Sequence, residues 1–243
     1  MSRIQPFPTR ITYYDLDYRG KIKLSALLRM VHVAADVDAK NLGVGYDVLA
    51  PLGMTFVLQR IGFSITRMPV YDEDVIIRTW PSTIARGTFL RQGDMYDKSG
   101  AKIMEWASLW LLFDIGARRV LKPKALPVPL PEIADEGVAI TPEKIALPQD
   151  FGFSSFSHRV SYRDVDTNIH MNNSIYGDLI GDAIFPATGP QDEPRPDWKQ
   201  VQINYLAEIR LGEEVEVAAH RDGDSYIVTG NVGGRAAFVA RVD

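Results

Sequence analysis

Residues 162–176 read YRDVDTNIHMNNSIY, and this stretch concentrates short polar side chains within an otherwise apolar half of the chain. Asp166, Asn168 and His170 stand at alternate positions. In an extended segment their side chains would leave the backbone on one side, whereas in a loop Asn and Asp tolerate the turns. Residues 174–184 follow with apolar side chains at helical spacing. The pattern predicts a polar segment that enters an amphipathic helix, whose first N–H groups are free to meet negative charge.

The same pattern occurs near the start of the chain. Residues 11–17, ITYYDLD, match residues 160–166, VSYRDVD, without a gap and 149 positions apart. Residues 24–41 then have the spacing of a long helix, with Gly43 as its stop. A duplicated unit of strand, helix and antiparallel strands is the better interpretation of a 243-residue chain. The strand candidates span residues 55–66, 73–80, 89–97, 101–114, 200–209, 214–220, 225–232 and 235–241.

The two copies differ at two polar positions. Asn168 corresponds to Arg19, and His170 corresponds to Lys21. Both copies keep the acidic pair, but the amide and the imidazole occur only in the second copy. We therefore interpret the shared residues as architectural and the unshared residues as candidates for function. Asp164, with Asn172 and Asn173, is more simply read as a turn or capping residue.

The segment between the copies has a different character. Residues 121–148 contain six prolines and lose the periodicity of helices and strands. Proline blocks the hydrogen bonds of both ladders and helices, so this segment is expected to be a linker or a connection along the surface. We expect an N-terminal domain at residues 1–120, a Pro-rich linker at 121–150 and a C-terminal domain at 151–243 that carries the functional residues.

Composition excludes several classes of protein. Apolar residues make up 46% of the chain and charged residues 24%, with a net charge of −4, so no basic field suggests nucleic-acid binding. The absence of cysteine removes disulfides, thiolate metal sites and a cysteine nucleophile. No apolar run approaches the ~18 residues of a membrane span, and the first residues lack the apolar core of a signal peptide. A cytoplasmic protein with no membrane contact is expected.

Cofactor motifs are also missing. His170 has no second histidine or carboxylate at a recognised ligand spacing, and the phosphate-loop and dinucleotide fingerprints do not occur. We expect no metal and no cofactor. The other histidines, His32, His158 and His220, are interpreted as ordinary polar residues with satisfied hydrogen bonds.

The run Asp-x-Asn-x-His-x-Asn-Asn at residues 166–173 resembles the signature of the acyl-ACP thioesterases. The resemblance covers essentially the whole chain. It implies an α+β tandem (double) hotdog fold, in which two antiparallel sheets each wrap around a long helix and a Pro-rich linker joins them. Residues 205–209, YLAEI, are similar to a second family segment, Tyr-x-x-Glu-Cys. Glu208 takes the place of the family's catalytic glutamate, and Ile209 replaces its cysteine, so a cysteine nucleophile cannot operate here.

The resemblance implies hydrolysis of a fatty acyl-acyl carrier protein thioester by water that a general base activates. Glu208 is our choice for the base, with His170 as the alternative, and a base of this kind contributes about 10²–10⁴-fold. Asn168 would orient the water or bind the carbonyl oxygen. Asp166 would hold Asn168 and His170 in place. The resemblance also implies that the first half binds the acyl chain, with Met30, Met54, Phe56 and Trp110 as candidate lining residues.

Other functions stay open at this point. An acyl-CoA thioesterase of the same fold would use similar residues on a different carrier. A non-enzymatic acyl-binding regulator would need no such set of polar residues, and a dehydratase acting on hydroxyacyl thioesters would pair a histidine with an acid across the two halves. The expected partner is acyl carrier protein, and the chain is expected to be a monomer or a homodimer, because a duplicated hotdog already supplies its own pairing.

Overall fold

The computed structural model describes residues 4–85, 87–133, 137–149, 154–185 and 198–243. The first half contains the strands β1 (Pro6–Arg10), β2 (Met54–Ile65), β3 (Asp74–Ala85), β4 (Thr88–Asp97), β5 (Lys102–Asp114) and β6 (Arg119–Val120), and the helices α1 (Leu24–Asn41) and α2 (Tyr46–Leu49). The second half contains α3 (Ile175–Ile184) and the strands β7 (Ser154–Arg159), β8 (Gln200–Tyr205), β9 (Glu214–Asp222), β10 (Ser225–Val232) and β11 (Arg235–Val242). Short 3-10 helices are η1 (Tyr13–Asp15), η2 (Ala50–Leu52), η3 (Pro123–Ala125) and η4 (Tyr162–Asp164).

The eleven strands of the described residues belong to one sheet. Its order is β1-β3-β4-β5-β2-β8-β11-β10-β9-β7, and β6 pairs with β5. The two halves join where β2 pairs with β8 in antiparallel register, with Ile61 opposite Ile203. The expectation of two separate sheets is therefore corrected to one continuous sheet. The physical reason is that pairing two edge strands satisfies backbone groups that each half would otherwise expose.

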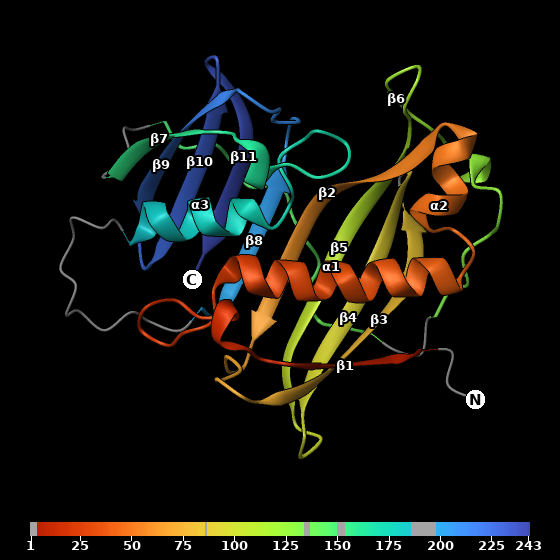
Figure 1. Cartoon of the computed structure of the whole chain (residues 1–243), viewed down its shortest axis with the longest axis horizontal. Coiled ribbons are helices and arrows are strands. Elements are labelled where there is room, and N and C mark those ends of the chain that lie inside the picture. The colour runs from red at the N-terminus through yellow and green to blue at the C-terminus, as the bar shows by residue number, and fades with distance from the viewer. Residues whose placement is uncertain (1–3, 86, 134–136, 150–153, 186–197) are drawn as a thin grey trace.

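Both long helices lie against the same face of this sheet (Figure 1). Helix α1 has the predicted bounds, and its apolar stripe, including Leu27, Leu28 and Val31, is buried in the main core. Gly43 follows the helix with φ of +75°, a left-handed conformation that glycine adopts without strain and that commonly ends helices. The prediction of the first helix and its stop is confirmed.

The two helices meet near their N-terminal ends. A Cβ atom placed on Gly177 of α3 would lie 2.5 Å from the backbone nitrogen of Ser25, so only glycine permits this approach. Beside this contact, the Ser25 hydroxyl donates a hydrogen bond to Asp178 of α3. The contact fixes the start of α1 against the first turn of α3.

Two expectations differ from the structure in detail. Residues 11–17 contain the short helix η1 rather than a strand, and the strand before them is β1. Strand β8 ends at Tyr205, because the next N–H groups, of Leu206 and Ala207, both donate to the carbonyl of Ala237. Glu208 therefore lies after the strand and not within it.

Part of the Pro-rich segment runs along the sheet. The carbonyl of Glu143 accepts hydrogen bonds from the side-chain amides of Gln202 and Asn204, at 2.7 and 3.0 Å. The backbone N–H groups of Glu143 and Ile145 donate to the same two amides, at 2.9 Å each. This part of the segment is thus held by side chains instead of a strand ladder. Residues 134–136 and 150 of the expected linker, and 151–153 of the expected C-terminal domain, lie outside the described residues.

Candidate active site

The polar motif forms a tight turn that leads toward α3. The N–H of Asp166 donates to the carbonyl of His170, and the N–H of Ile169 donates to the carbonyl of Asp166, both at 3.0 Å. The carboxylate of Asp166 accepts a hydrogen bond from the N–H of Asn168 at 2.8 Å. The loop alternative for this segment is therefore the one that the structure adopts, and Asp166 fixes both Asn168 and His170 through the backbone.

Ile169 has a strained backbone at the centre of this turn. Its φ is +61°, and its side chain is exposed. A β-branched residue in this region is a genuine outlier, because its Cβ crowds the following carbonyl. The strained residue lies between Asn168 and His170, the two polar residues that the first copy of the turn lacks.

Glu208 reaches the motif from the segment that follows β8. His170 forms an isolated antiparallel bridge with Arg210, and the N–H of Met171 donates to the carbonyl of Ile209 at 2.7 Å. This short pairing brings the carboxylate of Glu208 to the imidazole, with Oε2 at 3.3 Å from Nε2 of His170. Two residues from distant parts of the sequence are thus in hydrogen-bonding range, and both are half-buried.

Two arginines complete the surroundings of Glu208. Arg118, from the turn between β5 and β6, donates to Oε2 at 2.6 Å, and Arg210 lies 3.5 Å from the same oxygen. Burial would raise the pKa of Glu208, but the hydrogen bond from Arg118 and the charges of His170 and Arg118 outweigh burial and lower this pKa. Glu208 is therefore ionised at neutral pH. The hydrogen bond from Arg118 and the contacts given for His170 and Arg210 are all at Oε2, and among the described residues no hydrogen bond to Oε1 is found.

The first copy of the turn has nearly the same backbone. The N–H of Asp17 donates to the carbonyl of Lys21 at 2.7 Å, and the carboxylate of Asp17 accepts the N–H of Arg19 at 2.9 Å. Gly20, with φ of +75°, stands where the second copy has Ile169. The backbone hydrogen bonds of Asp166 are thus matched by those of Asp17, which indicates an architectural contribution from this aspartate.

A second pair of shared residues caps the 3-10 helices. The carboxylate of Asp164 accepts the N–H and hydroxyl of Ser161, both at 2.8 Å, and His158 lies 3.1 Å from it. The carboxylate of Asp15 accepts the N–H and hydroxyl of Thr12 at 2.8 and 2.6 Å. The interpretation of Asp164 as a capping residue agrees with these contacts, and so does that of His158 as a residue with a satisfied hydrogen bond.

The N–H groups at the start of α3 are largely occupied. The N–H of Ser174 donates to the side chain of Asn172, and the N–H of Ile175 donates to its carbonyl, both at 2.9 Å. The N–H of Gly177 donates to the carbonyl of Ser174 at 2.9 Å. These bonds satisfy donors that a helix start otherwise leaves unpaired. The expectation of free donors at this helix start is therefore corrected for the N–H groups of Ser174, Ile175 and Gly177.

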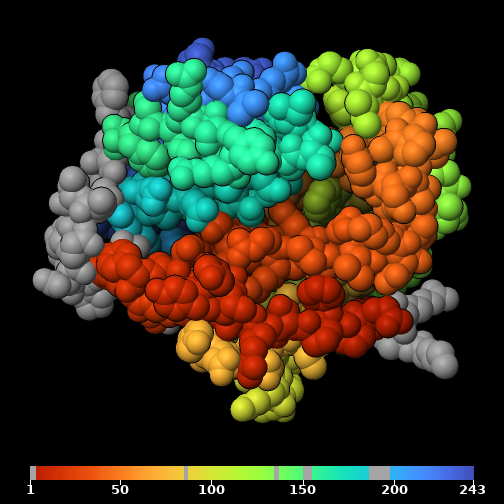
Figure 2. Space-filling model, viewed as in Figure 1, coloured from red at the N-terminus to blue at the C-terminus, as the bar shows by residue number. Residues whose placement is uncertain are grey.

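A cavity of about 250 Å³ lies in the first half, beside the turn. Phe56 and Trp110, two of the candidate lining residues, form part of its wall. In the described part of the chain, Met30 is instead buried in the main core, and Met54 packs against the smaller cluster around Leu49, Phe89 and Leu112. Figure 2 shows the surface hollowed between the segment around α2 and the second half.

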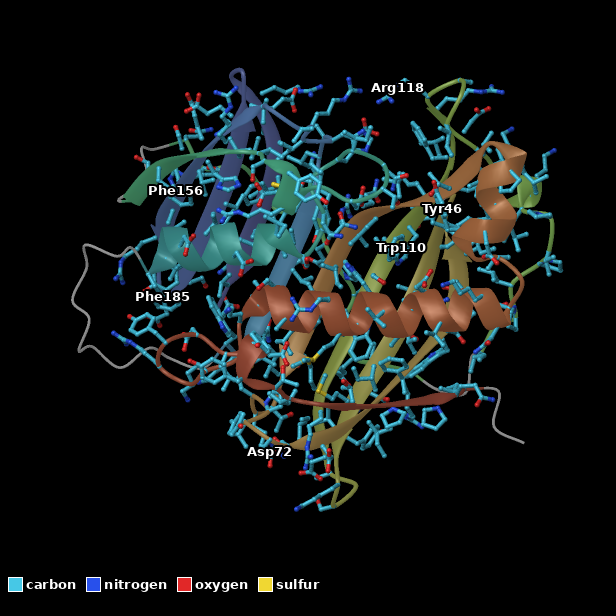
Figure 3. All side chains as sticks on the ribbon, viewed as in Figure 1. Tyr46, Asp72, Trp110, Arg118, Phe156 and Phe185 are labelled. Carbon is cyan, nitrogen blue, oxygen red and sulfur yellow. The ribbon has the colours of Figure 1, made fainter. Side chains whose placement is uncertain are left out.

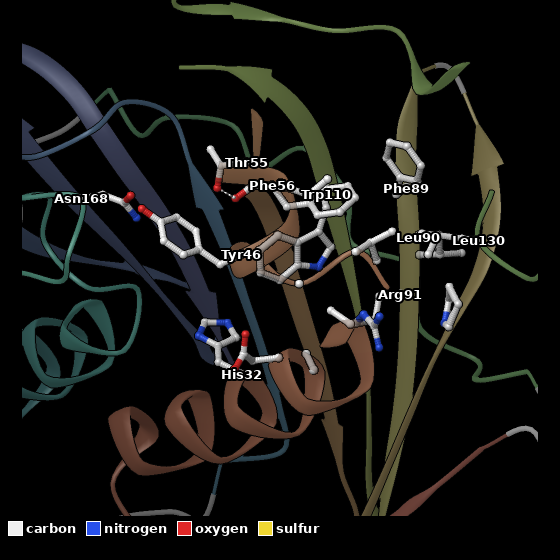
Figure 4. Close-up of a pocket in the computed structure, with 17 residues that line it drawn as sticks. His32, Tyr46, Thr55, Phe56, Phe89, Leu90, Arg91, Trp110, Leu130 and Asn168 are labelled. Atoms are coloured by element: carbon white, nitrogen blue, oxygen red, sulfur yellow. Dashed lines mark hydrogen bonds between the residues drawn. The ribbon is translucent and has the colours of Figure 1, made fainter. Parts of the chain in front are cut away.

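Asn168 is the one lining residue that comes from the second half of the described chain. Figure 4 shows it on the opposite side from Phe89 and Leu130, with Tyr46 next to it among the labelled residues. Its side chain has no hydrogen-bond partner among the described residues, where only its backbone N–H is bonded. An amide that is free to bind a ligand therefore stands at the end of an apolar cavity.

The cavity wall also contains polar groups that the sequence did not single out. His32 stacks edge to face on Trp110 with ring centroids 6.0 Å apart, and burial lowers its pKa to about 4, so the imidazole is neutral at physiological pH. Its Nε2 is buried without a hydrogen-bond partner in the described structure, so the expectation of a satisfied histidine is wrong for His32. Arg91 forms a buried ion pair with Asp38 at 2.6 Å.

Among the residues with described positions, no group of three or more His, Asp or Glu side chains could hold a metal ion. None of the described helices is both long enough and apolar enough to span a membrane.

The antiparallel sheet with its few helices defines an α+β, hotdog-like fold of the thioesterase type. Residues 8–124 match the acyl-ACP thioesterase N-terminal domain, and residues 149–233 match the C-terminal domain of the same family. The chain therefore belongs to the acyl-ACP thioesterase family.

Solved structures agree in fold. An acyl-ACP thioesterase from Bacteroides thetaiotaomicron superposes with a TM-score of 0.87 at 22% identity, over 100% of this chain and 99% of that one. The 12:0-ACP thioesterase from Umbellularia californica gives a TM-score of 0.85 at 16% identity, over 100% and 97%. A comparison with curated protein sequences found no significant match.

Proposed function

We propose that this protein hydrolyses fatty acyl-acyl carrier protein thioesters to free fatty acid and carrier protein, by direct attack of water. The observation that carries the proposal is the contact between Glu208 and His170, 3.3 Å apart, at a turn whose Asn168 lines an apolar cavity. Family membership supports the carrier as the natural substrate. The cavity would hold the acyl chain, and Phe56 and Trp110 would contact it.

Glu208 acts as the general base in this mechanism. The carboxylate is ionised at neutral pH, and no hydrogen bond occupies its Oε1 among the described residues. Oε1 takes a proton from a water molecule while the water oxygen bonds to the thioester carbonyl carbon. When the intermediate collapses, the C–S bond breaks and the proton returns to the thiolate, so Glu208 ends as it began. A positioned base of this kind contributes about 10²–10⁴-fold.

Asn168 and His170 assist this step in different ways. The amide N–H₂ of Asn168 stabilises the negative charge that develops on the carbonyl oxygen, and one such donor elsewhere contributes about 10²–10³-fold. His170 holds Oε2 of Glu208 and orients the carboxylate. Asp166 holds the turn that carries both residues, and it acts through their position.

The test is a measurement of thiol release from a panel of acyl carrier protein and CoA thioesters with different chain lengths. The chain contains no cysteine, so a thiol reagent reports only the released carrier thiol. We expect higher kcat/KM for acyl carrier protein thioesters, and a clear loss in Asp166→Ala. Higher kcat/KM for the CoA thioesters would assign the activity to CoA, and no release from any thioester would refute hydrolysis.

A further inference from the structure

The turn between β5 and β6 crosses from the first half to the site. The N–H of Ile115 donates to the carbonyl of Gly53, and the N–H of Ala117 donates to the carboxylate of Asp114, both at 2.8 Å. Arg118 follows with φ of +49°, a left-handed conformation that is uncommon for a residue other than glycine. Figure 3 shows Arg118 at the rim of the molecule, where this turn faces the second half. The turn is fastened to the first half, and its arginine side chain extends beyond it.

Arg118 makes the shortest contact to the proposed base. Its guanidinium donates to Oε2 of Glu208 at 2.6 Å, across 90 positions of sequence. His170 and Arg210 lie farther from the same oxygen, at 3.3 and 3.5 Å. A charge-assisted hydrogen bond at this distance fixes the rotation of a carboxylate more firmly than the two longer contacts. Because this hydrogen bond holds Oε2, the orientation of Oε1 is fixed as well.

We propose that Arg118 is a positioning residue, supplied by the first half, which holds Oε2 of Glu208 so that Oε1 is presented to the attacking water. This inference rests on the proposed function of Glu208. It assigns a part of the hydrolytic site to a half of the molecule whose own copy of the turn lacks the amide and the imidazole.

The charges around Glu208 predict a second effect. Arg118 faces it from the β5–β6 turn, His170 from the motif turn and Arg210 from its own segment, and the phenol of Tyr176 in α3 interacts with it electrostatically. Removal of Arg118 takes away the closest positive charge, so the pKa of Glu208 rises. The acid limb of the rate profile then moves to higher pH.

Removal of an ordinary surface ion pair would neither misplace Glu208 nor move the acid limb of the rate profile. The Arg118 side chain is 54% exposed, and exposed ion pairs often contribute little to stability. Arg241 offers a matched control, because its side chain is 43% exposed and its guanidinium lies 2.8 Å from Asp222. Arg241 pairs with Gln202 near the start of β8, whereas Glu208 follows the end of that strand. Its removal should leave the site unchanged.

The experiment compares wild type, Arg118→Ala, Arg118→Lys and Arg241→Ala in thiol release from an acyl-pantetheine thioester, which carries no carrier protein. For Arg118→Ala we expect kcat to fall about tenfold, as for a slightly misplaced catalytic group, with KM changed less than kcat. Its acid limb should move to higher pH. Arg118→Lys should recover part of kcat, because lysine keeps the charge but not the planar fork. Arg241→Ala should match wild type.

Several outcomes would overturn the inference. The first is an Arg118→Ala variant whose kcat and acid limb match wild type, or in which only KM changes. The second is a loss of kcat in Arg241→Ala equal to that in Arg118→Ala. The third is an Arg118→Lys variant that recovers no kcat. Melting temperatures check that each variant is folded, and Arg118→Gln replaces the alanine variant if that variant does not fold. An inactive wild type would refute the proposed function instead. Active wild type with inactive Glu208→Gln and unaffected Arg118→Ala would refute only the role of Arg118.

Discussion

The two turns before α1 and α3 have nearly the same backbone and different chemistry. Each contains an aspartate whose carboxylate accepts a hydrogen bond from the N–H of the residue two positions later. The N–H of the same aspartate donates to the carbonyl of the residue four positions later. The first turn then presents Arg19 and Lys21, and the second presents Asn168 and His170 at the matching positions. The shared residues therefore build the same turn twice, and the side chains that differ are the ones to which we assign the proposed function.

The strongest way to break this comparison is to give the second turn the side chains of the first. We expect Asn168→Arg combined with His170→Lys to lower kcat by at least about 10²-fold, because the amide donor is replaced by a longer guanidinium in a different position and the imidazole that contacts Glu208 is lost. The free energy of unfolding should change by no more than about 1 kcal/mol, because Asn168 is exposed and His170 is half-buried. Thiol release and chemical denaturation measure the two quantities. A large loss of stability would mean that the second turn is not built like the first.

Substitution of the shared carboxylates tests the opposite side of the comparison. Asp15→Asn and Asp164→Asn should each lower the free energy of unfolding by about 2 kcal/mol, because each carboxylate is buried and accepts charge-assisted hydrogen bonds. Denaturation in urea checks this. Similar losses in the two variants would support equivalent architecture, and a loss confined to one of them would contradict it.

The same carboxylates predict a pH dependence. Burial alone would raise both pKa values, but hydrogen bonds from Thr12 and Arg29 to Asp15, and from Ser161 and His158 to Asp164, lower them. Because the folded pKa lies below the unfolded value of about 3.9, the stabilisation is complete above that value and is lost as pH falls through the folded pKa. Wild-type stability should therefore fall steeply in acid. In the two Asn variants this fall should be shallower, as measured by unfolding between pH 2 and 6.

The smallest expected effect is a change in stability on substitution of Ile169 or Gly20, the residue with positive φ in each turn. Ile169 and Gly20 occupy equivalent places with φ of +61° and +75°. Ile169→Gly should stabilise the protein by about 0.5–1 kcal/mol through relief of strain, less the entropy cost of glycine, and Gly20→Ile should destabilise it by about 1–2 kcal/mol. Melting curves of both variants measure this. Destabilisation by Ile169→Gly would show that the isoleucine side chain makes contacts that outweigh the strain.

Much of the fold could be predicted from local pattern. The bounds of α1 and β10 coincide with the predicted ones, because an apolar stripe, a terminal glycine and turn residues are all encoded nearby. The continuous sheet could not be predicted, because the pairing of β2 with β8 depends on which edges remain open after each half folds. The left-handed Ile169 had one available signal, which was Gly20 at the matching position.

The site was predicted unevenly for a similar reason. His170 and Asn168 stand in one motif, and Glu208 was found through a second short segment. Arg118 was missed as a site residue, because no local pattern links it to a carboxylate 90 positions away. The polar wall residue His32 was missed because a lone histidine on a helix gives no signal of an unpaired nitrogen.

The proposed hydrolysis depends most on Glu208 as the base. The direct measurement is kcat for Glu208→Gln at saturating acyl-carrier thioester, with the melting temperature as the check on folding. Glutamine keeps the shape but cannot take a proton from water, so we expect kcat to fall by about 10²–10⁴-fold while KM stays within a few-fold of wild type. A folded Glu208→Gln enzyme with near-wild-type kcat would contradict the account.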